Sequence, residues 1–583
     1  MKQFKDPIYG YINIPKDIVN KIIDTPTFQR LRYIQQTSYL PVYSAALHNR
    51  FIHSLGVYFL GDKACIAITD NSKDILDEFQ SDQLGFNIIK IFKLACLLHD
   101  VGHAPFSHSG EDFFIDEAKS IYSNLISSVD DHLFSTDVEY YHKFAKPAAP
   151  HEIMSVIVSI KQFAEFFPNA KTKDFFARCI TGYKYRDIEI NPAHAVLNAF
   201  ICLLNSTTID VDRLDYLIRD AFVMGYNSIS IDYNRLLGSL ILVKVQDSTN
   251  NTPIQLAYKK SALSVIENVI YAHDSVKKWV QNHPIIAYEV FLIQQIIGFV
   301  QYEYKHATGK SLFSLEFLLP HDHTTQNSFF ENAYYKIDEL INKLSTDESS
   351  SLIITDLQSI KADLSHLRLS NNIHLLCDDD IIHIAKSIDH PLCSELFNRV
   401  LRRHPVWKSE SEYKVFIDGY VGDNTYPVLQ QQVGLLNKFI NEEVPSHSIN
   451  DEALKICGEK LTQIESYVTS PQDKENMRDR YNSLLKWIEA FKTISKDASL
   501  KYFDFLIVPA SKFESGFKKH DLSEMPIYFP ECRRIYALKE LINLFSLKEE
   551  ERKKYFYVYY KREFGEHLDP LIVGKAISKL ALE

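Results

Sequence analysis

The chain is long and has an ordinary globular composition, with 583 residues of which 46% are hydrophobic and 24% charged. This composition excludes a disordered chain and a fibrous repeat, and the length corresponds to roughly three or four domains. The 64 basic and 75 acidic residues give a formal net charge of -11. That balance argues against a general nucleic-acid coat and leaves only a local basic site possible.

The first residues, MKQFKDP, contain no apolar stretch after the lysines, so we expect neither a signal peptide nor a transit sequence. We also expect no apolar run of the about 18 to 20 residues that cross a membrane. Eight cysteines are widely scattered without a CxxC pair, which is typical of buried reduced thiols. These features predict a cytoplasmic protein.

Helical patterns dominate the first half of the chain. Long apolar segments without proline at 86–98 and 285–300 predict helices. A stretch containing several Ser and Asp residues at 123–137 is predicted to be a loop excursion. We therefore predict that the region up to about residue 305 is one mostly helical domain.

The second half begins after a polar run at 346–351, which is predicted to be a surface linker. Helical patterns continue over 373–401. Between 501 and 528, β-branched and aromatic residues interrupted by Pro509 and Gly516 predict a few strands. We expect a mainly α fold with a smaller mixed α/β lobe at the C-terminal end.

The pair His99-Asp100 carries the strongest chemical signal, since it ends the apolar helix and Gly102 follows it. A buried helix seldom ends in such a pair unless something offsets the cost of removing a carboxylate from water, and a divalent cation would do so. His53 upstream and Asp212 downstream complete a set of two nitrogen and two carboxylate ligands. That set suits Mg, Mn, Fe or Zn. A lone His-Asp pair, by contrast, is usually a hydrogen-bonded helix end.

The order His, His-Asp, Asp is the pattern of the HD-domain metal-dependent phosphohydrolases. The chain resembles the HD-domain dNTP triphosphohydrolases along nearly its whole length, both the vertebrate members apart from their sterile-alpha-motif domain and the bacterial dNTPase and dGTPase members. The resemblance rests on HNRFIHSLGV at 48–57, LLHDVGHAPFSHSGE at 97–111 and IDVDRLDYLIRDA at 209–221. It implies an HD catalytic domain over 1–310 and a C-terminal oligomerisation or regulatory lobe over 311–583.

The resemblance implies roles for named residues. The implied metal ligands are His53, His99, Asp100 and Asp212. The implied catalytic residues are the acid-base pair His108 and Glu111, spaced i and i+3, and the phosphate-contacting His103 and His151. Each of these histidines on its own would more often be structural.

The resemblance also implies substrate contacts. Arg50 and Arg213 match triphosphate contacts, and their rigid guanidinium groups suit phosphate oxygens. Three residues match those that recognise the deoxyribose, namely Gln36, Tyr216 and Asp220. Helix packing and surface charge are the alternatives for Tyr216 and Asp220.

The chain departs from the family in the same region. Gln281 stands where the family has a tyrosine that stacks on the sugar, His283 matches a pocket residue, and His273 aligns with an arginine that touches phosphate. These departures leave the base preference open.

A second nucleotide site is implied by Asp24, Gln29 and Arg32, which match residues that hold an activating nucleotide at an oligomer interface. The alternative is that DTPTFQRLR is a capped helix start, with Asp24 or Thr25 as the cap and Pro26 in the first turn. Lys5 differs from the family at this site, so the identity of the activator stays open.

The expected activity is metal-dependent hydrolysis of dNTPs to deoxynucleoside and inorganic triphosphate by a nucleotide-activated homo-oligomer (dimer, tetramer or hexamer), for dNTP-pool control or antiphage dNTP depletion. One alternative is a different HD nucleotide phosphatase or phosphodiesterase. The other is a nucleotide-sensing or single-stranded nucleic-acid-binding scaffold, for which Arg402-Arg403-His404 and Lys518-Lys519-His520 are the basic clusters.

Overall fold

A computed structural model gives the structure. It describes residues 1–38, 40–78, 85–111, 118–189, 191–226, 229–244, 254–308, 375–388, 390–418, 470–495, 505–509, 519–542, 555–561 and 568–580, with a few single positions between 341 and 462. The statements below concern these residues.

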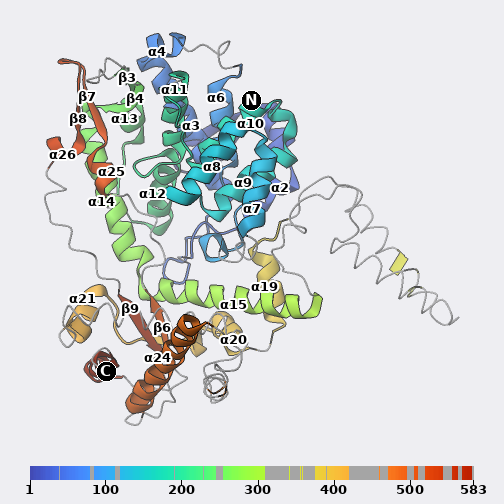
Figure 1. Cartoon of the computed structure of the whole chain (residues 1–583), viewed down its shortest axis with the longest axis vertical. Helices are drawn as coiled ribbons and strands as arrows, with labels where there is room; N and C mark the ends of the chain where they lie inside the picture. The colour runs from blue at the N-terminus through green and yellow to red at the C-terminus, as the bar shows by residue number, and fades with distance from the viewer. Residues whose placement is uncertain are drawn as a thin grey trace.

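The fold is mainly α, as the sequence predicts (Figure 1). The helices of the first 310 residues are α1 (Lys16–Ile18), α2 (Pro26–Gln29), α3 (Arg50–Asn71), α4 (Lys73–Glu78), α6 (Ile88–Leu98), α7 (Ala118–Val129), α8 (His132–Phe144), α9 (Pro150–Gln162), α10 (Ala170–Thr181), α11 (Ala193–Leu204), α12 (Val211–Met224), α13 (Tyr233–Gly238), α14 (Leu263–Val276) and α15 (Pro284–Thr308). The later helices are α19 (Asp378–Lys386), α20 (Pro391–Phe397), α21 (Glu410–Tyr413), α24 (Pro471–Ser495), α25 (Lys519–Ser523), α26 (Leu538–Leu541) and α27 (Pro570–Leu580).

Three small sheets accompany the helices. β1 (Lys2–Asp6) and β2 (Gly10–Ile14) form an antiparallel hairpin in which Lys2 faces Ile14. The second sheet has the order β3-β4-β7-β8, from β3 (Leu240–Lys244), β4 (Ile254–Lys259), β7 (Pro526–Phe529) and β8 (Arg534–Ala537). The third has the order β5-β9-β6, from β5 (His404–Pro405), β9 (Phe556–Tyr560) and β6 (Phe505–Pro509).

The second sheet joins distant parts of the chain, because β4 pairs in parallel with β7. The strands predicted within 501–528 are found as β6 and β7. The proposed boundary at residue 310 thus separates two strands of this sheet from the other two, and the domain division stays a prediction.

Side-chain caps set the start of the helices that carry the site. Asn49 caps α3 by accepting a hydrogen bond from Ile52 N at 3.2 Å. Asn87 caps α6 in the same way, and Asp210 caps α12 by accepting from Arg213 N at 2.8 Å. Such caps satisfy backbone donors that a helix start leaves unpaired. They therefore fix which residues occupy the first turns of these helices.

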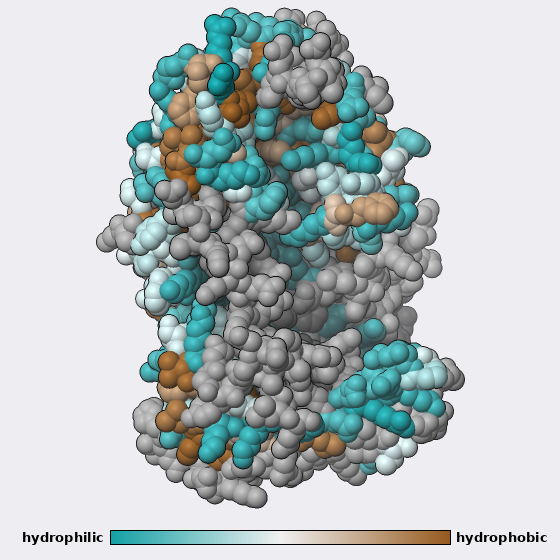
Figure 2. Space-filling model, turned by 60° about the vertical axis from the view of Figure 1, so that its left-hand side comes forward, coloured by the Kyte–Doolittle hydropathy of each residue, from teal (hydrophilic) through white to brown (hydrophobic). Residues whose placement is uncertain are grey.

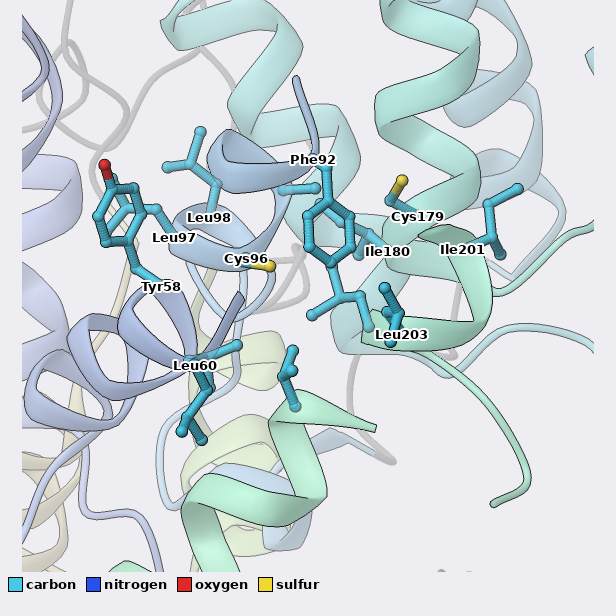
Figure 3. Packing of buried hydrophobic residues seen from close by; sticks show 14 of the residues in the cluster. Tyr58, Leu60, Phe92, Cys96, Leu97, Leu98, Cys179, Ile180, Ile201 and Leu203 are labelled. Atoms are coloured by element: carbon cyan, nitrogen blue, oxygen red, sulfur yellow. The ribbon is translucent and has the colours of Figure 1, made fainter. Parts of the chain in front are cut away.

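Helix α15 belongs to both hydrophobic cores of the protein. The larger core, part of which Figure 3 shows around Phe92 and Cys96, includes Ile293 and Ile297 of α15. The smaller core lies around β6 and β9 and includes Phe291 and Leu292 of the same helix. In Figure 1, α15 accordingly runs between the large group of helices and the C-terminal lobe.

The prediction of a loop at 123–137 is wrong, because helices α7 and α8 occupy most of this segment. Buried Ile121, Leu125 and Val129 recur every four residues and form an apolar face on α7 that outweighs the Ser-rich composition. The real break is at Asp130, whose φ of 55° ends α7 before Asp131 caps α8. The predicted linker at 346–351 lies outside the described residues.

The expectation that no segment reaches membrane-spanning length also needs correction. Two helices, Arg50–Asn71 and Pro284–His306, pass the test of length and composition, although 72% and 61% of them are buried within the protein. Core helices of this length pass the same test. On the face in Figure 2, the described hydrophobic residues form separate small groups with hydrophilic residues between them.

We predict that Gly102→Ala destabilises the fold. A Cβ at Gly102 would lie 2.3 Å from the backbone nitrogen of Ser155 in α9. The loop that follows α6 would therefore have to move away from helix α9. Overpacking of this kind costs about 1 to 3 kcal/mol, measurable as a lower midpoint of thermal unfolding. Gly238→Ala is the matched control, because a Cβ there meets no atom within 4 Å. An unchanged midpoint for Gly102→Ala would contradict the prediction.

Candidate functional site

The four predicted metal ligands converge from three helices. His53 lies in the second turn of α3, His99 and Asp100 follow the end of α6, and Asp212 lies in the first turn of α12. The Nε2 atom of His53 is 2.9 Å from Asp212 Oδ1, 3.3 Å from His99 Nε2 and 3.6 Å from Asp100 Oδ2. His99 Nε2 is 3.5 Å from both carboxylates.

These separations fit a bound cation. Ligands about 2.1 Å from a metal lie about 3.0 Å apart at neighbouring octahedral positions and about 3.4 Å apart in a tetrahedron. The observed range of 2.9 to 3.6 Å includes both geometries. Asp212 is 37% exposed while His53 is fully buried, so the cluster has one open side. His53, His99 and Asp100 can therefore hold a divalent metal, with Asp212 beside the two histidines, and the ligand set leaves its identity open between Mg, Mn, Fe and Zn.

A buried carboxylate holds the ring of His53 from behind. Asp215 Oδ2 lies 2.7 Å from His53 Nδ1, and Asp215 is held in turn by Arg219 at 2.9 Å and by the hydroxyl of Tyr9 at 2.8 Å. Arg219 also donates to Asp6. A hydrogen bond of this kind orients a metal-binding histidine and leaves Nε2 for the metal.

Asp215 is part of this site, although the sequence motifs predict no role for it. Asp215 and Arg219 are four residues apart on α12, and Asp212 precedes Asp215 by one turn. The i, i+3 and i+7 spacing was visible in DRLDYLIRD, but only Asp212 belongs to the ligand pattern. The signal that could have identified Asp215 is this spacing, which places the three charged residues on one face of the helix.

The charges in the cluster favour a cation. Burial alone would lower the pKa of His53, but its hydrogen bonds to Asp212 and Asp215 raise that pKa to about 10. Burial would likewise raise the pKa of Asp100, yet Arg50, His99 and His53 hold it below its ordinary value. The carboxylates thus stay ionised and draw positive charge, which a proton or a metal ion can supply.

The predicted catalytic residues form a second cluster around one carboxylate oxygen. We call His103, His108, Glu111 and His151 the histidine cluster. Glu111 Oε1 lies 2.5 Å from His108 Nδ1, 2.9 Å from His151 Nδ1 and 3.5 Å from His103 Nε2. The rings of His103 and His151 stack with centroids 4.4 Å apart.

Protonation differs within the histidine cluster. Burial and the nearby cations Arg50 and His151 lower the pKa of His103 well below its ordinary value. Burial opposes protonation of His151 too, but Glu111 raises its pKa to about 9. Glu111 remains ionised, because His151 and His108 lower its pKa although burial raises it. The cluster therefore contains a neutral imidazole and a carboxylate anion side by side.

A pocket with about 610 Å³ of open space, counting its mouth, has His108 of the histidine cluster in its wall. Its walls include the predicted substrate residues Arg50, Gln36, Tyr216 and Asp220, together with His108 and Gln281. Arg50 connects the pocket with the metal cluster, since its Nη1 lies 2.6 Å from Asp100 Oδ2 and its Nε donates to Ser107 Oγ at 2.8 Å.

Two pocket residues are tied to a histidine that the sequence analysis leaves without a role. Asp220 Oδ1 lies 2.8 Å from His48 Nε2, and both side chains are almost fully buried. Gln36 N donates to the backbone oxygen of His48, whereas Gln36 Oε1 is buried without a hydrogen-bond partner among the described residues. Gln36, His48 and Asp220 thus form one unit of the pocket wall.

The other predicted contacts are placed differently. Arg213 is held beside the cap of α12, donating to Thr208 O at 2.8 Å and to Asp210 Oδ2 at 2.7 Å, so phosphate binding by it stays a prediction. His273 is buried, and its Nδ1 lies 3.5 Å from Asp274. His283 accepts a hydrogen bond from Ile285 N, and burial lowers its pKa.

The predicted activator residues lie together at the surface. Arg32 Nε donates to Gln29 Oε1 at 2.8 Å and its guanidinium stacks 3.5 Å from the ring centroid of Phe51. Asp24 pairs with Lys2 at 3.4 Å. Thr25 caps α2 by accepting from Phe28 N, and Pro26 occupies its first turn, so the capped-helix interpretation is confirmed. A role in nucleotide binding stays a prediction.

A segment from beyond residue 370 holds the loop between the two clusters. Asp378, the first residue of α19, accepts from Phe106 N at 2.6 Å and from Gln35 N at 2.9 Å. Phe106 has a left-handed φ of 56°, which is costly for a residue with a side chain. Arg30 adds to this support by donating to Leu376 O at 2.7 Å and to Val101 O at 3.3 Å. The sequence gives no local sign of these long-range contacts.

The comparisons with known proteins agree with this geometry. Residues 50–152, which include three of the four metal ligands and the whole histidine cluster, match the family described as HD domain. The chain carries an HD domain. The predicted resemblance to the HD-domain dNTP triphosphohydrolases is confirmed by this match together with the relatives of the chain, although over 41% of the chain and not over nearly its whole length.

Three relatives show the extent of the similarity. The deoxynucleoside triphosphate triphosphohydrolase SAMHD1 of Danio rerio is 32% identical over 41% of this chain and 36% of its own length. The uncharacterized protein YwfO of Bacillus subtilis is 28% identical over 58% of this chain and 64% of its own length. The putative HD domain-containing protein L394 of Acanthamoeba polyphaga mimivirus is 26% identical over 73% of this chain and 83% of its own length.

The match thus spans little more than a third of the SAMHD1 protein and less than two thirds of YwfO. Among solved structures, a phosphohydrolase from Bacteroides thetaiotaomicron aligns with 97% of this chain and 100% of its own at 17% identity and a TM-score of 0.49.

We predict that Asp215→Asn weakens metal binding by the HD domain by about 10- to 100-fold, because His53 loses the charged acceptor that orients its ring. Calorimetric titration of metal-stripped protein with Mn²⁺ measures the change. Tyr9→Phe is the matched control, since it removes one hydrogen bond to Asp215 and keeps the carboxylate. Equal affinities of Asp215→Asn and wild-type protein, both folded by circular dichroism, would refute this role.

We predict that Asp378→Asn loosens the loop between the clusters. An amide can accept from only one of the two backbone N–H groups through its oxygen, so the other loses its acceptor, at a cost of about 1 to 3 kcal/mol. Chemical denaturation measures the loss. Asp379→Asn is the control, because Asp379 is its exposed neighbour in α19. Similar stability of the two variants would count against the predicted clamp.

Proposed function

We propose that the protein hydrolyses deoxynucleoside triphosphates. Water adds to the α-phosphorus, the bond from phosphorus to the 5′ oxygen breaks, and the products are a deoxynucleoside and inorganic triphosphate. The observation that carries the proposal is the placement of His108, which Glu111 contacts, on the pocket that Arg50 links to the metal cluster. The similarity to SAMHD1 supports the choice of substrate.

A divalent metal held by His53, His99, Asp100 and Asp212 would supply a Lewis acid for a phosphate oxygen and an activated water. Arg50 contributes fixed positive charge at the junction of the metal cluster and the pocket, where triphosphate would lie. Because Ser107 and Asp100 both hold its guanidinium, little reorganisation is needed when substrate binds.

The proton for the leaving 5′ oxygen would come from His108. Glu111 stays ionised and contacts His108 Nδ1 at 2.5 Å, so it orients the ring of His108. The side chain of His108 is 43% exposed and lines the pocket, whereas His103 is fully buried. Of the rings in the cluster, His108 is therefore the best placed to reach a substrate.

Sugar recognition is assigned to other residues of the pocket wall. Tyr216 offers a ring and a hydroxyl, and Asp220, held by His48, offers a carboxylate to a 3′-hydroxyl. Gln36 has an amide oxygen for which the described chain provides no partner, so a ligand hydroxyl or base could satisfy it. Together these groups support discrimination of the sugar through hydrogen bonds and close packing.

A second candidate is another HD nucleotide phosphatase or phosphodiesterase. It is favoured by Gln281, which lines the pocket where the family resemblance places a stacking tyrosine. An amide side chain provides hydrogen bonds in place of an aromatic face and would admit a different sugar or base. The products distinguish the two candidates, because stepwise release of phosphate belongs to the second.

The proposal includes regulation by a nucleotide and a biological role. A nucleotide activator would bind where Asp24, Gln29 and Arg32 meet, with Arg32 exchanging its contact with Gln29 for a phosphate. Assembly of a homo-oligomer around that site would suit dNTP-pool control or antiphage dNTP depletion in the cytoplasm.

A nucleic-acid-binding role has less support. Arg402 and Arg403 pair with Glu289 and Glu395, so this basic cluster offers little free charge.

Each dNTP, singly and as a mixture of four, should yield deoxynucleoside and intact triphosphate in the presence of Mg²⁺ or Mn²⁺. Chromatography of the products measures this, with His99→Ala, Asp100→Ala protein as the inactive control, because it lacks two of the four ligands. Activity confined to the mixture would support the activator site. Release of single phosphates would refute the proposed reaction. It would also be refuted if the wild-type protein and the control gave the same products.

A further inference from the structure

The histidine cluster has the chemistry of a metal site in its own right. It presents three imidazoles and one carboxylate, and one ligand atom from each residue lies within 4.8 Å of those of the others. Its residues come from the loop after α6 and from the start of α9. None of them belongs to the set of His53, His99, Asp100 and Asp212, so the HD domain holds two separate groups of potential ligands.

The ring of His103 points to a ligand that the protein chain does not provide. It is fully buried, yet neither of its nitrogens has a hydrogen-bond partner among the described residues. Buried polar atoms of this kind are uncommon because each leaves the cost of its desolvation unmet. His103 Nε2 lies 3.5 Å from Glu111 Oε1, close to the separation of two ligands in a tetrahedral site.

We propose that the histidine cluster binds a second metal ion of the zinc class, and that this ion inhibits the enzyme. Three nitrogen donors and a carboxylate suit Zn²⁺ or Co²⁺, whereas Mg²⁺ prefers oxygen ligands and competes weakly for either group of histidines. The inhibitory part rests on the proposed function. A metal that occupies Glu111 and His108 removes the pair that would protonate the leaving oxygen.

Two features of the cluster favour a metal over an empty site. One oxygen of Glu111 lies within 3.5 Å of a nitrogen of each of the three rings, so the four ligands already converge, and His108, at 2.5 Å, must move away from Glu111 to admit an ion. The stacked rings of His103 and His151 restrict each other and reduce the entropy lost on binding.

Metal counting tests the site without any assumption about catalysis. Metal-stripped full-length protein is dialysed against Zn²⁺ in the presence of excess Mg²⁺, and bound zinc is counted by mass spectrometry. We expect about two zinc ions per wild-type chain and about one in each of two double variants, His99→Gln, Asp212→Asn and Glu111→Gln, His151→Gln. His194→Gln is the matched control, since His194 pairs with a single carboxylate, Asp187, outside both groups.

The alternative outcomes are distinct. A single zinc ion in wild-type protein, or two in Glu111→Gln, His151→Gln, would overturn the second site. Titration of wild-type protein with Co²⁺ provides a measurement that depends on no variant: two successive ions should give visible bands without the near-ultraviolet band of a cobalt–thiolate bond. That band would assign the second ion to one of the cysteines and refute the proposal.

An activity measurement then separates the two parts of the inference. If the protein hydrolyses dNTPs with Mg²⁺ or Mn²⁺, occupation of the second site should reduce the rate at least tenfold, and a chelator should restore it. Two bound zinc ions with undiminished hydrolysis would refute inhibition and leave the site standing. Two bound zinc ions in a protein without dNTP hydrolysis would refute the proposed function alone.

Discussion

The concentration of negative charge around His53 is the interaction on which the rest of the HD domain depends. Asp100, Asp212 and Asp215 lie within 3.6 Å of its two ring nitrogens, and Asp100 and Asp215 are buried there. Their mutual repulsion is acceptable only if cations lie between and behind them. Arg50 and Arg219 provide the fixed part of that charge, and the metal position provides the rest. The hairpin, α3 and α12 are therefore held together by electrostatics at one end and by apolar packing along their lengths.

The sequence was sufficient for the ligands because their types, order and spacing are local properties. His53 follows its cap by one helical turn, His99-Asp100 follows an apolar helix, and Asp212 follows the cap Asp210. Mainly helical structure could be predicted for the same reason, since α6 and α15 are long and apolar. Composition misled only where an apolar face was diluted by serine and aspartate, as in α7.

What could not be predicted depends on contacts between distant segments. Asp378 reaches Phe106 across 272 positions and Gln35 across 343, and nothing in the local sequence of α19 indicates it. His48 and Asp220 meet across 172 positions in the same way. The arrangement of three histidines around Glu111 is a further case, because His151 comes from another helix. Such contacts require the packed structure, since loop closure over these lengths leaves no pattern in the chain.

Because α15 belongs to both hydrophobic cores, the chain cannot be cut after this helix without exposing apolar side chains. Ile286 and Val290 of this helix line the pocket, while Phe291 and Leu292 pack against the C-terminal lobe. A fragment that ends after the helix would expose a row of large apolar side chains to water beside the pocket. The first 308 residues are thus unsuited to an independent existence, and changes in the packing around β6 and β9 will alter the shape of the pocket wall.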